Sequence, residues 1–386
     1  MASIALHGRV LVLVPDHTRT FPHAAVLRSI ATEIAPRVEQ VDVMIALGTH
    51  PGLSDAEIGK LFDLPGQPQT VDAVTIVNHE WWDPAELADF GTIPAREVEV
   101  LSEGRLTIDV PVRLNRRLRE YDHLVVCGPV FPHEVAGFSG GNKYFVPGVA
   151  AQEIIDVTHW VGALITSSAV IGRADTPVRR FIDRAASLIP AARHAICLVI
   201  DPGHRIQIFA GTPEDAFGAA ARASAEVHIR RLAEPVERAL AILPEMYDEL
   251  WVGAKGMYKL EAVVADGGEL VIAAPHLHEV SRTHGELIGE IGYHVRDYFT
   301  AQWERFEHIP WGVLAHSTHL RGTGTYVDGV ERPRIDVTLA TGIPADECAA
   351  LGLGYLDPAT VDVDEWRASG ALVVDHAGEM LYVLEE

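Results

Sequence analysis

Residues 132–143 bring a histidine, a flexible backbone and a lysine together within one twelve-residue stretch. The glycines among them, including Gly140 and Gly141, let the backbone pass close to a bound group and adopt conformations that a Cβ would forbid. His133 opens the stretch and Lys143 ends it. At that position the lysine could meet a phosphate, a carbonyl or a thioester. The stretch therefore predicts a ligand-binding loop with a candidate nucleophile.

Two more polar groups follow directly on strand-like apolar runs. The first, after residues 9–14, is the tetrapeptide Asp16, His17, Thr18 and Arg19. Ligands gather at strand ends in α/β sheets, and an arginine there can grip a phosphate or carboxylate bidentately. The tetrapeptide would also serve as a helix N-cap with surface charges. This alternative stays open on the tetrapeptide alone.

His50, in Gly48-Thr49-His50, repeats this arrangement after the apolar run 41–47. A histidine can act as a general base because its usual pKa lies near operating pH. A single histidine at a strand end is more often structural. His159, sixteen residues after Lys143, is a further candidate.

Two other chemistries compete for the central stretch. Residues 137–141 fit G-x-S-x-G, which would make Ser139 the nucleophile of a serine hydrolase. That motif needs a strand directly before the serine and a helix directly after it, and neither is expected here. A closed zinc site is disfavoured because no HExxH or paired-cysteine spacing occurs. The sequence is still compatible with a metal that has one protein ligand and takes its other ligands from a cofactor.

The composition limits the partners. The 386 residues carry a net charge of −23, which argues against nucleic acid and anionic membranes. Cys127, Cys197 and Cys348 are scattered and odd in number, as suits a reducing compartment. No apolar run approaches 18 residues and no signal-peptide pattern is present. We therefore expect a soluble cytoplasmic protein.

The element pattern predicts an α/β fold of two domains with mostly parallel sheets and a cofactor site in the cleft between them. Residues 1–232 would form the N-terminal catalytic and cofactor domain, and residues 233–365 the C-terminal domain. A hairpin within 366–386 could pack back on the first. Hairpins are also expected at 98–112 and 195–208, helices at 153–166, 178–189 and 214–232, and further strands at 73–77 and 123–130. A second series of strands and helices is expected over 250–252, 260–265, 270–273, 286–303, 312–315 and 334–339.

The motifs resemble, in order, those of the nickel-dependent lactate racemase family. They are the tetrapeptide at 16–19, Gly48-Thr49-His50, residues 132–143, the His159 segment, and Lys255-Gly256-Met257 with Glu261-Ala262 and Gly267-Gly268. Together they span most of the chain, and the central motif is highly specific.

The resemblance implies a 2-hydroxy acid racemase or epimerase that depends on a nickel-pincer nucleotide, the pyridinium-3-thioamide-5-thiocarboxylic acid mononucleotide. By that resemblance, Lys143 would be its covalent anchor and His159 its nickel ligand. Residues 16–19, with Gly140 and Gly141, would contact the cofactor. His50 and His133 would be the acid/base pair, and Arg19 and Lys255 would bind the substrate. Proteins that synthesise the cofactor are the implied partners.

Two departures from the family pattern bear on the substrate. Val252 stands where a substrate-side glutamine is expected, and the N-terminal part is shorter. Losing that polar contact favours a larger or more polar 2-hydroxy acid over lactate, with Lys259 and the C-terminal histidines as possible contacts. A serine hydrolase using Ser139 and a non-catalytic carrier of the nickel cofactor are the alternative functions. Retention of both His50 and His133 argues against a carrier, since storage needs no pair of bases.

Overall fold

The computed structural model describes residues 5–64, 70–71 and 73–385. They divide into two compact units, each assembled from several segments of the chain. The first unit comprises the described residues of Met1–Phe131, Phe138–Thr158 and Ala174–Val227. The second comprises Pro132–Gly137, His159–Arg173 and the described residues of His228–Glu386.

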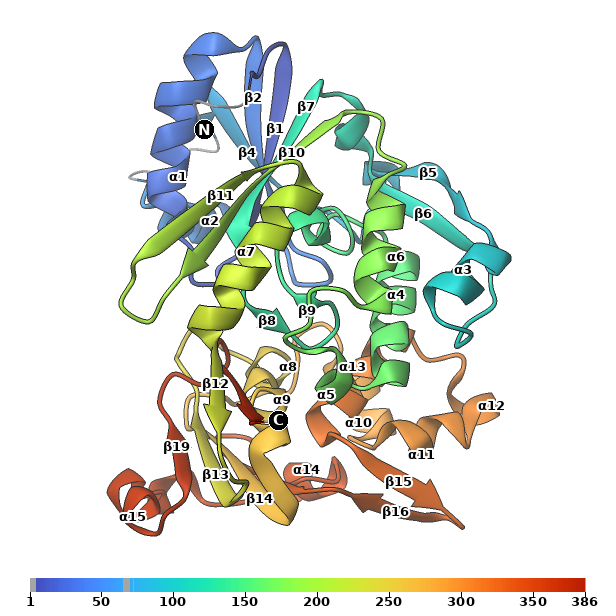
Figure 1. The fold of residues 1–386 in the computed structure, drawn as a ribbon, viewed down its shortest axis with the longest axis vertical. Coiled ribbons are helices and arrows are strands. Elements are labelled where there is room, and N and C mark those ends of the chain that lie inside the picture. Colours follow the sequence, from blue (N-terminus) through green and yellow to red (C-terminus); the bar gives the residue numbers. More distant parts are fainter. Residues whose placement is uncertain (1–4, 65–69, 72, 386) are drawn as a thin grey trace. The chain divides into compact units, whose positions relative to one another are not determined.

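A seven-stranded sheet forms the centre of the first unit, in the order β11-β10-β7-β1-β2-β4-β3 (Figure 1). Its inner pairs are parallel, while β11 and β3 are antiparallel to their neighbours. After Arg9 the central strand β1 is apolar and buried, as expected of a strand covered on both faces. The strands are β1 (Arg9–Pro15), β2 (Gln40–Ala46), β3 (Thr70–Val71), β4 (Val74–Asn78), β7 (His123–Pro129), β10 (Ala192–Ile200) and β11 (Ile206–Gly211).

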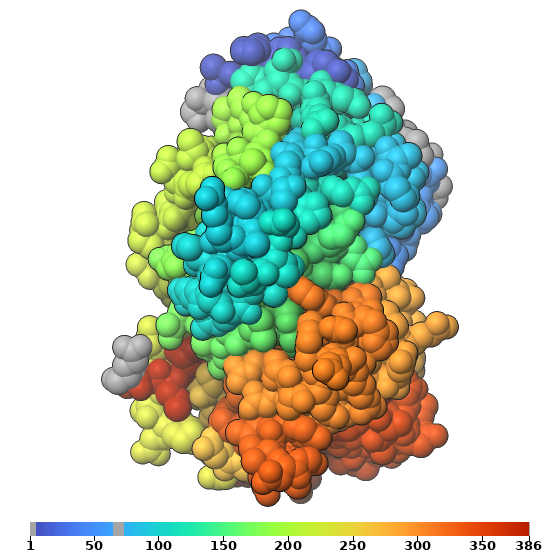
Figure 2. Space-filling model, turned by 90° about the vertical axis from the view of Figure 1, so that its right-hand side faces the viewer, coloured from blue at the N-terminus to red at the C-terminus, as the bar shows by residue number. Residues whose placement is uncertain are grey.

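Helices and a small antiparallel pair complete the first unit. The pair is β5 (Leu87–Ile93) with β6 (Val110–Asn115). Figure 2 shows this region, in cyan, as a closely packed part of the surface. The helices are α1 (His23–Ser29), α2 (Asp55–Phe62), α3 (Ala95–Leu101), α4 (Gln152–Ile165), α6 (Pro177–Ala186) and α7 (Pro213–His228), and the shorter turns are η1 (Ile30–Ile34), η2 (Ala35–Arg37), η3 (Pro84–Glu86), η4 (Arg116–Arg119) and η5 (Gly141–Tyr144). The part of α4 from His159 onward and the last residue of α7, His228, belong to the second unit.

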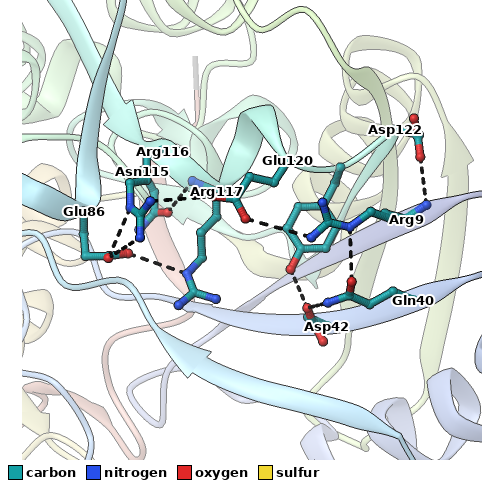
Figure 3. Close-up of polar contacts among 10 residues, drawn as sticks. Arg9, Gln40, Asp42, Glu86, Asn115, Arg116, Arg117, Glu120 and Asp122 are labelled. Carbon is teal, nitrogen blue, oxygen red and sulfur yellow. Dashed lines mark hydrogen bonds and ion pairs between the residues drawn. The ribbon is translucent and has the colours of Figure 1, made fainter.

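A polar network ties β1 and β2 to the segment that leads into β7 (Figure 3). The backbone N–H of Arg9 donates to Asp122 at 2.8 Å, and its side chain donates to Gln40 at 3.1 Å. Gln40 and the Tyr121 hydroxyl both donate to Asp42. These bonds satisfy a buried carboxylate and fix the starts of adjacent strands.

The second unit is built on a five-stranded, wholly parallel sheet in the order β18-β17-β14-β13-β19. Its strands are β13 (Val236–Ile242), β14 (Val264–Ala274), β17 (Asp336–Thr341), β18 (Gly354–Tyr355) and β19 (Leu372–Val374). Smaller pairs are β12 (Ile229–Leu232) with β20 (Leu381–Leu384) and β15 (Gly324–Val327) with β16 (Val330–Pro333). A further pair is β8 (Pro132–His133) with β9 (Gly137–Phe138), of which Phe138 belongs to the first unit. The helices and turns are α5 (Ser167–Val170), α8 (Leu250–Gly253), α9 (Lys255–Tyr258), η6 (Glu261–Val263), α10 (Gly285–Ile291), α11 (Arg296–Thr300), α12 (Trp303–Phe306), α13 (Trp311–Arg321), α14 (Ala345–Ala350), η7 (Pro358–Thr360) and α15 (Val363–Ala368).

The α/β class with mostly parallel sheets is confirmed, as is the hairpin within 195–208. Two local predictions were wrong. Residues 98–112 are a helix end, a turn and a strand, because Glu103 and Gly104 adopt positive φ at a helix C-terminus instead of in a hairpin. Within the second series of strands and helices, the runs 250–252 and 312–315 are helical. A helix buried on most sides lacks the polar face by which its sequence could be told from that of a strand.

The predicted hairpin in 366–386 is the second error. Residues 372–374 join the five-stranded sheet as β19, whereas 381–384 pair in parallel with β12. The turn at 375–380 therefore connects strands of two different sheets. Both partners belong to the second unit.

Candidate active site

A buried carboxylate and a histidine meet where two neighbouring strands of the first unit end. Asp16 follows β1 and His50 follows β2, and the two strands pair in parallel register. Asp16 Oδ2 lies 2.5 Å from His50 Nδ1. With Nδ1–H donating to the carboxylate, the imidazole turns its Nε2 away as a bare base.

The rest of the tetrapeptide fixes the Asp16 carboxylate. Its Oδ1 accepts from the backbone N–H of Thr18 at 3.0 Å and from the Thr18 hydroxyl at 2.7 Å. Arg19 Nη1 donates to that hydroxyl at 3.0 Å. Burial alone would raise the pKa of Asp16, but His50, Arg19 and Thr18 outweigh it and hold the pKa well below its usual range. The Asp16 carboxyl is thus an anion at neutral pH. His17, the remaining member of the tetrapeptide, is exposed.

Lys143 lies in η5, a short turn that packs against β1, β7 and β10. It is half-buried. The turn is tied to the loop after β2, because the N–H of Gly48 donates to the carbonyl of Gly148 at 3.0 Å and the N–H of Gly148 donates to that of Lys143 at 3.0 Å. The structure therefore holds the lysine-bearing turn and the His50 loop together.

The two glycines before Lys143 have a packing role. Both adopt positive φ, 89° for Gly140 and 58° for Gly141. A Cβ on Gly140 would lie 2.5 Å from the Val130 side chain, and one on Gly141 would lie 2.8 Å from that of Phe217. These positions thus require glycine whether or not the backbone also contacts a cofactor.

Arg179, which sequence reasoning missed, fixes this glycine loop from α6. It is 3% exposed and donates to the carbonyls of Phe138 and Gly140, the latter at 3.2 Å. Its guanidinium also stacks 3.8 Å from the centre of the Phe217 ring. Burial lowers the pKa of Arg179 to about 10, so it stays charged at neutral pH.

Ser139 is held by the backbone on both sides. Its hydroxyl accepts from the N–H of Phe131 at 3.0 Å and donates to the carbonyl of Pro129 at 2.9 Å. The turn that follows is a 3₁₀ helix, not the α-helix of a nucleophile elbow. A hydroxyl whose proton already bonds to a carbonyl is a poor nucleophile, which argues against the hydrolase alternative.

His133 and Glu134 lie in the second unit. His133 is buried, and its Nδ1 lies 3.2 Å from the N–H of Val135 and 3.3 Å from Glu134 Oε2. The two contacts need opposite states of Nδ1: bare for the first, protonated for the second. In a neutral ring that accepts from Val135, Nδ1 is bare and Nε2 carries the proton, whereas protonation of the ring would let Nδ1 donate to Glu134 instead. Lys259, 1% exposed, donates to the carbonyl of Pro132 and positions this segment.

His159 shares an electrostatic environment with two histidines of α13 that sequence reasoning did not assign. Burial lowers the pKa of His319 to about 4, with Glu134 opposing the shift and His159 adding to it. Burial, with His319, His284 and His159, also lowers the pKa of His316. The sequence does hold a signal for this pair, because residues three apart, such as His316 and His319, lie on the same face of a helix.

His316 stacks on Trp251, with ring centroids 3.9 Å apart. Trp251 directly precedes Val252, which is 5% exposed and packs in the hydrophobic core. Lys255 is 6% exposed, and its ammonium lies 4.3 Å from the centre of the Tyr247 ring. The second unit thus gathers histidines, an aromatic side chain and a buried lysine.

Within the described ranges, no group of three or more His, Cys, Asp or Glu side chains is arranged to hold a metal by itself. The helices in those ranges are also too short or too polar to cross a membrane.

The fold and the site define an α/β protein with a glycine-flanked lysine and histidines that can exchange protons. Residues 2–172 match the family model for the lactate racemase N-terminal domain. A lactate racemase from Thermoanaerobacterium thermosaccharolyticum is 28% identical over 271 residues, or 69% of this chain and 59% of that protein. One from Lactiplantibacillus plantarum is 27% identical over 158 residues, or 39% and 32%. The match thus spans less than two thirds of these relatives.

Two solved structures are similar over nearly the whole chain. A crystal structure of a Thermotoga maritima protein has a TM-score of 0.91 and 32% identity, covering 100% of this chain and 95% of that one. The lactate racemase apoprotein from Thermoanaerobacterium thermosaccharolyticum has a TM-score of 0.72 and 21% identity, covering 98% and 87%, and shares the fold. The chain is thus similar in sequence to the lactate racemase family, whose N-terminal domain its residues 2–172 match, and in fold to a lactate racemase over nearly its whole length.

Proposed function

We propose that this protein inverts C2 of a 2-hydroxy acid, with a nickel-pincer nucleotide as its cofactor and His50 and His133 as the acid/base pair. The observation that carries the proposal is the 2.5 Å contact between His50 and the buried Asp16 carboxylate. A lone structural histidine needs no such partner. A base that takes a hydroxyl proton does, because the anion fixes its tautomer and stabilises its protonated form.

The residues present fit the implied cofactor in their chemistry. Neutral imidazole, as His159 provides, is a good nickel ligand. Lys143 supplies an amine at the end of the glycine loop, and Arg19 supplies a guanidinium suited to a phosphate. When bound, the cofactor would accept a hydride from C2 and return it to either face.

The protein residues then hold the substrate and move its hydroxyl proton. Arg19 and Lys255 are cations suited to the substrate carboxylate. His50 and His133 would each serve one enantiomer, taking the hydroxyl proton in one direction and returning it in the other. Each must act as base and acid, as the Asp16 and Glu134 contacts to their Nδ1 atoms allow. A carrier of the cofactor would need neither contact.

The test of the cofactor assignment is intact mass with nickel analysis, on protein made in cells able to build the nucleotide. Wild type should carry one covalent adduct and one nickel per chain, and Lys143→Ala should carry no adduct. His159→Ala should lose nickel. An adduct that maps elsewhere on wild type refutes the anchor, and undiminished nickel in His159→Ala refutes the ligand.

The test of the reaction is substrate labelled with deuterium at C2. A hydride held apart from water keeps its label, whereas a proton on a base near neutral pKa exchanges with water between turnovers. The product should therefore retain deuterium and form more slowly than from unlabelled acid. Loss of label to water at the rate of inversion would leave two-base proton abstraction instead.

A further inference from the structure

The strand β11 forms an open edge of the seven-stranded sheet (Figure 1). It pairs with β10 on one side and ends the strand order on the other. The remaining edges of the two large sheets are β3, β18 and β19, which have two, two and three residues in the part of the chain that the structure describes. Short edge strands protect a sheet from pairing with another chain. β11 has six residues and therefore lacks this protection.

The backbone of β11 turns part of its hydrogen-bonding groups toward the open edge. The carbonyl of Leu198 on β10 accepts from the N–H of Val130 at 2.8 Å, on the side of β10 away from β11. Because the N–H and C=O of a strand residue point the same way, Leu198 exchanges no bonds with Ile208, its partner in the register. The N–H and C=O of Ile208 therefore point outward, and so do those of Ile206 and Ala210, two residues away on either side.

The side chains along this edge are apolar and exposed. Ile206 is 44% exposed and Ile208 is 66% exposed, although their partners on β10, Ile200 and Leu198, are buried in the core on the same face of the sheet. Residues 206–211 include no charged residue and no proline, and their ladder with β10 runs without a bulge. The charges, prolines and bulges that usually block edge pairing are thus absent from β11.

We propose that β11 pairs with β11 of a second copy of this chain, antiparallel about a twofold axis at Ile208. In this register Ile208 lies opposite Ile208 and Ile206 lies opposite Ala210, so that each outward N–H and C=O gains a partner. The exposed Ile208 side chains then cover each other and join the apolar faces of the two sheets. The inference concerns a different surface from the proposed active site and does not depend on the proposed function.

The charges beside β11 are complementary in this arrangement. The register places Arg205 of one copy opposite Gly211 of the other. A Cβ on Gly211 would lie 3.9 Å from the Asp215 Cβ, so Arg205 would lie beside that carboxylate. Asp215 is exposed, and Arg205, which pairs with Asp201 at the hairpin turn, has a side chain that is 88% exposed. By symmetry the contact closes with two such ion pairs, whereas parallel pairing in register would set Arg205 against Arg205.

The first test is sedimentation velocity of the full chain between about 1 μM and about 500 μM, since contacts as small as one strand pair are weak and reversible. Wild type should form a dimer as the concentration rises. Ile208→Lys sets two ammonium groups against each other and should weaken the dimer at least about tenfold. Val100→Lys, at a 74% exposed valine of α3, is the matched control and should leave association unchanged.

The second test addresses the register. Arg205→Glu should weaken the dimer about twofold to fivefold, as for exposed ion pairs, and Arg205→Glu combined with Asp215→Lys should restore it. In wild type, the amides of Ile206, Ile208 and Ala210 should exchange with deuterium more slowly at the high concentration than at the low one. The amide of Gln207 points to β10 and should stay protected in every variant, which shows that β11 is folded.

Three results would overturn the inference. The first is a monomer over the whole concentration range. The second is a dimer that Ile208→Lys does not weaken, and the third is a dimer in which the outward amides of β11 exchange as fast as in the monomer. Either of the last two would assign association to another surface.

Discussion

His50 and His133 are held in different ways. His50 takes its partner from another strand end, so its orientation depends on the registry of β1 and β2. His133 takes its Nδ1 contacts from Glu134 and Val135, its neighbours in sequence. The first histidine is therefore positioned by the sheet and the second by a local turn. Asp16 is the residue to change for His50, because it is buried and its Oδ2 contacts His50 Nδ1 at 2.5 Å.

Asp16→Asn should lower turnover by about 10²-fold or more, because an amide can present N–H to His50 Nδ1 and so stabilise the wrong tautomer. The matched control is Asp42→Asn on β2, a buried aspartate that accepts from Tyr121 and Gln40 away from the site. It should turn over near the wild-type rate. The measurement is kcat in both directions by chiral chromatography. Equal loss in the two variants would indicate a general effect of removing buried charge.

The specificity prediction also belongs to single residues. Val252 packs in the core and offers no polar contact to substrate. Lactate should therefore be a poor substrate beside a longer 2-hydroxy acid in a panel of hydroxy and aldonic acids. Lactate as the best substrate by kcat/KM would refute this expectation.

At the scale of elements, the glycine loop depends on a helix that carries no predicted site residue. Thr176 caps α6 by accepting from the N–H of Arg179 at 3.0 Å. Arg179 then holds two loop carbonyls just before Lys143. The planar guanidinium of arginine can donate to both carbonyls at once. A lysine ammonium, a single point on a shorter side chain, cannot donate to both equally well.

Arg179→Lys should lower the free energy of unfolding by about 2 kcal/mol or more, since a buried carbonyl loses its donor. Arg180→Lys is the control from the next position. That arginine is exposed and pairs with Asp175, and such surface pairs contribute about 1 kcal/mol at most. Urea unfolding of the two variants makes the comparison. A smaller loss for Arg179→Lys than for Arg180→Lys would remove Arg179 from its positioning role.

Strand ends were predictable and buried helices were not. The first unit's strands are long apolar runs, so their ends, and hence Asp16 and His50, could be located from sequence. α13 is buried along most of its length, so its apolar run 312–315 carries no amphipathic pattern from which a helix could be predicted. His316 and His319 were consequently left unassigned. Arg179 could not be found because its role depends on contacts about forty residues away in sequence.

At the scale of the molecule, burial lowers the pKa of several histidines in both units. They are His23, His79, His123, His194, His316 and His319. A histidine whose folded pKa lies below its unfolded value near 6.5 binds a proton more readily in the unfolded chain. Its contribution to stability is therefore complete above about pH 6.5 and is lost as the pH falls toward the folded pKa. All six act in the same direction.

His79 shows the structural cause most clearly. It is fully buried, its Nε2 donates to the carbonyl of Ala150 at 3.1 Å, and its Nδ1 accepts from Asn115 at 3.2 Å. Protonation of Nδ1 would turn that acceptor into a donor facing another donor. Burial accordingly lowers the pKa of His79 to about 4, against the opposing effects of Ala150 and Glu86.

Between pH 7.5 and pH 5.0 the protein should lose several kcal/mol of stability, of which His79 accounts for about 2 kcal/mol. His79→Gln keeps an N–H for the Ala150 carbonyl but cannot take up a proton. Its stability should therefore fall by about 2 kcal/mol less than that of wild type over this range, even if it is less stable at pH 7.5. Urea unfolding at the two pH values gives the difference, and the exposed His308→Gln controls for removal of a histidine. A His79→Gln protein with the wild-type pH dependence would show that His79 is protonated equally in the folded and unfolded chains. A neutral His79 ring held by two hydrogen bonds would then be refuted.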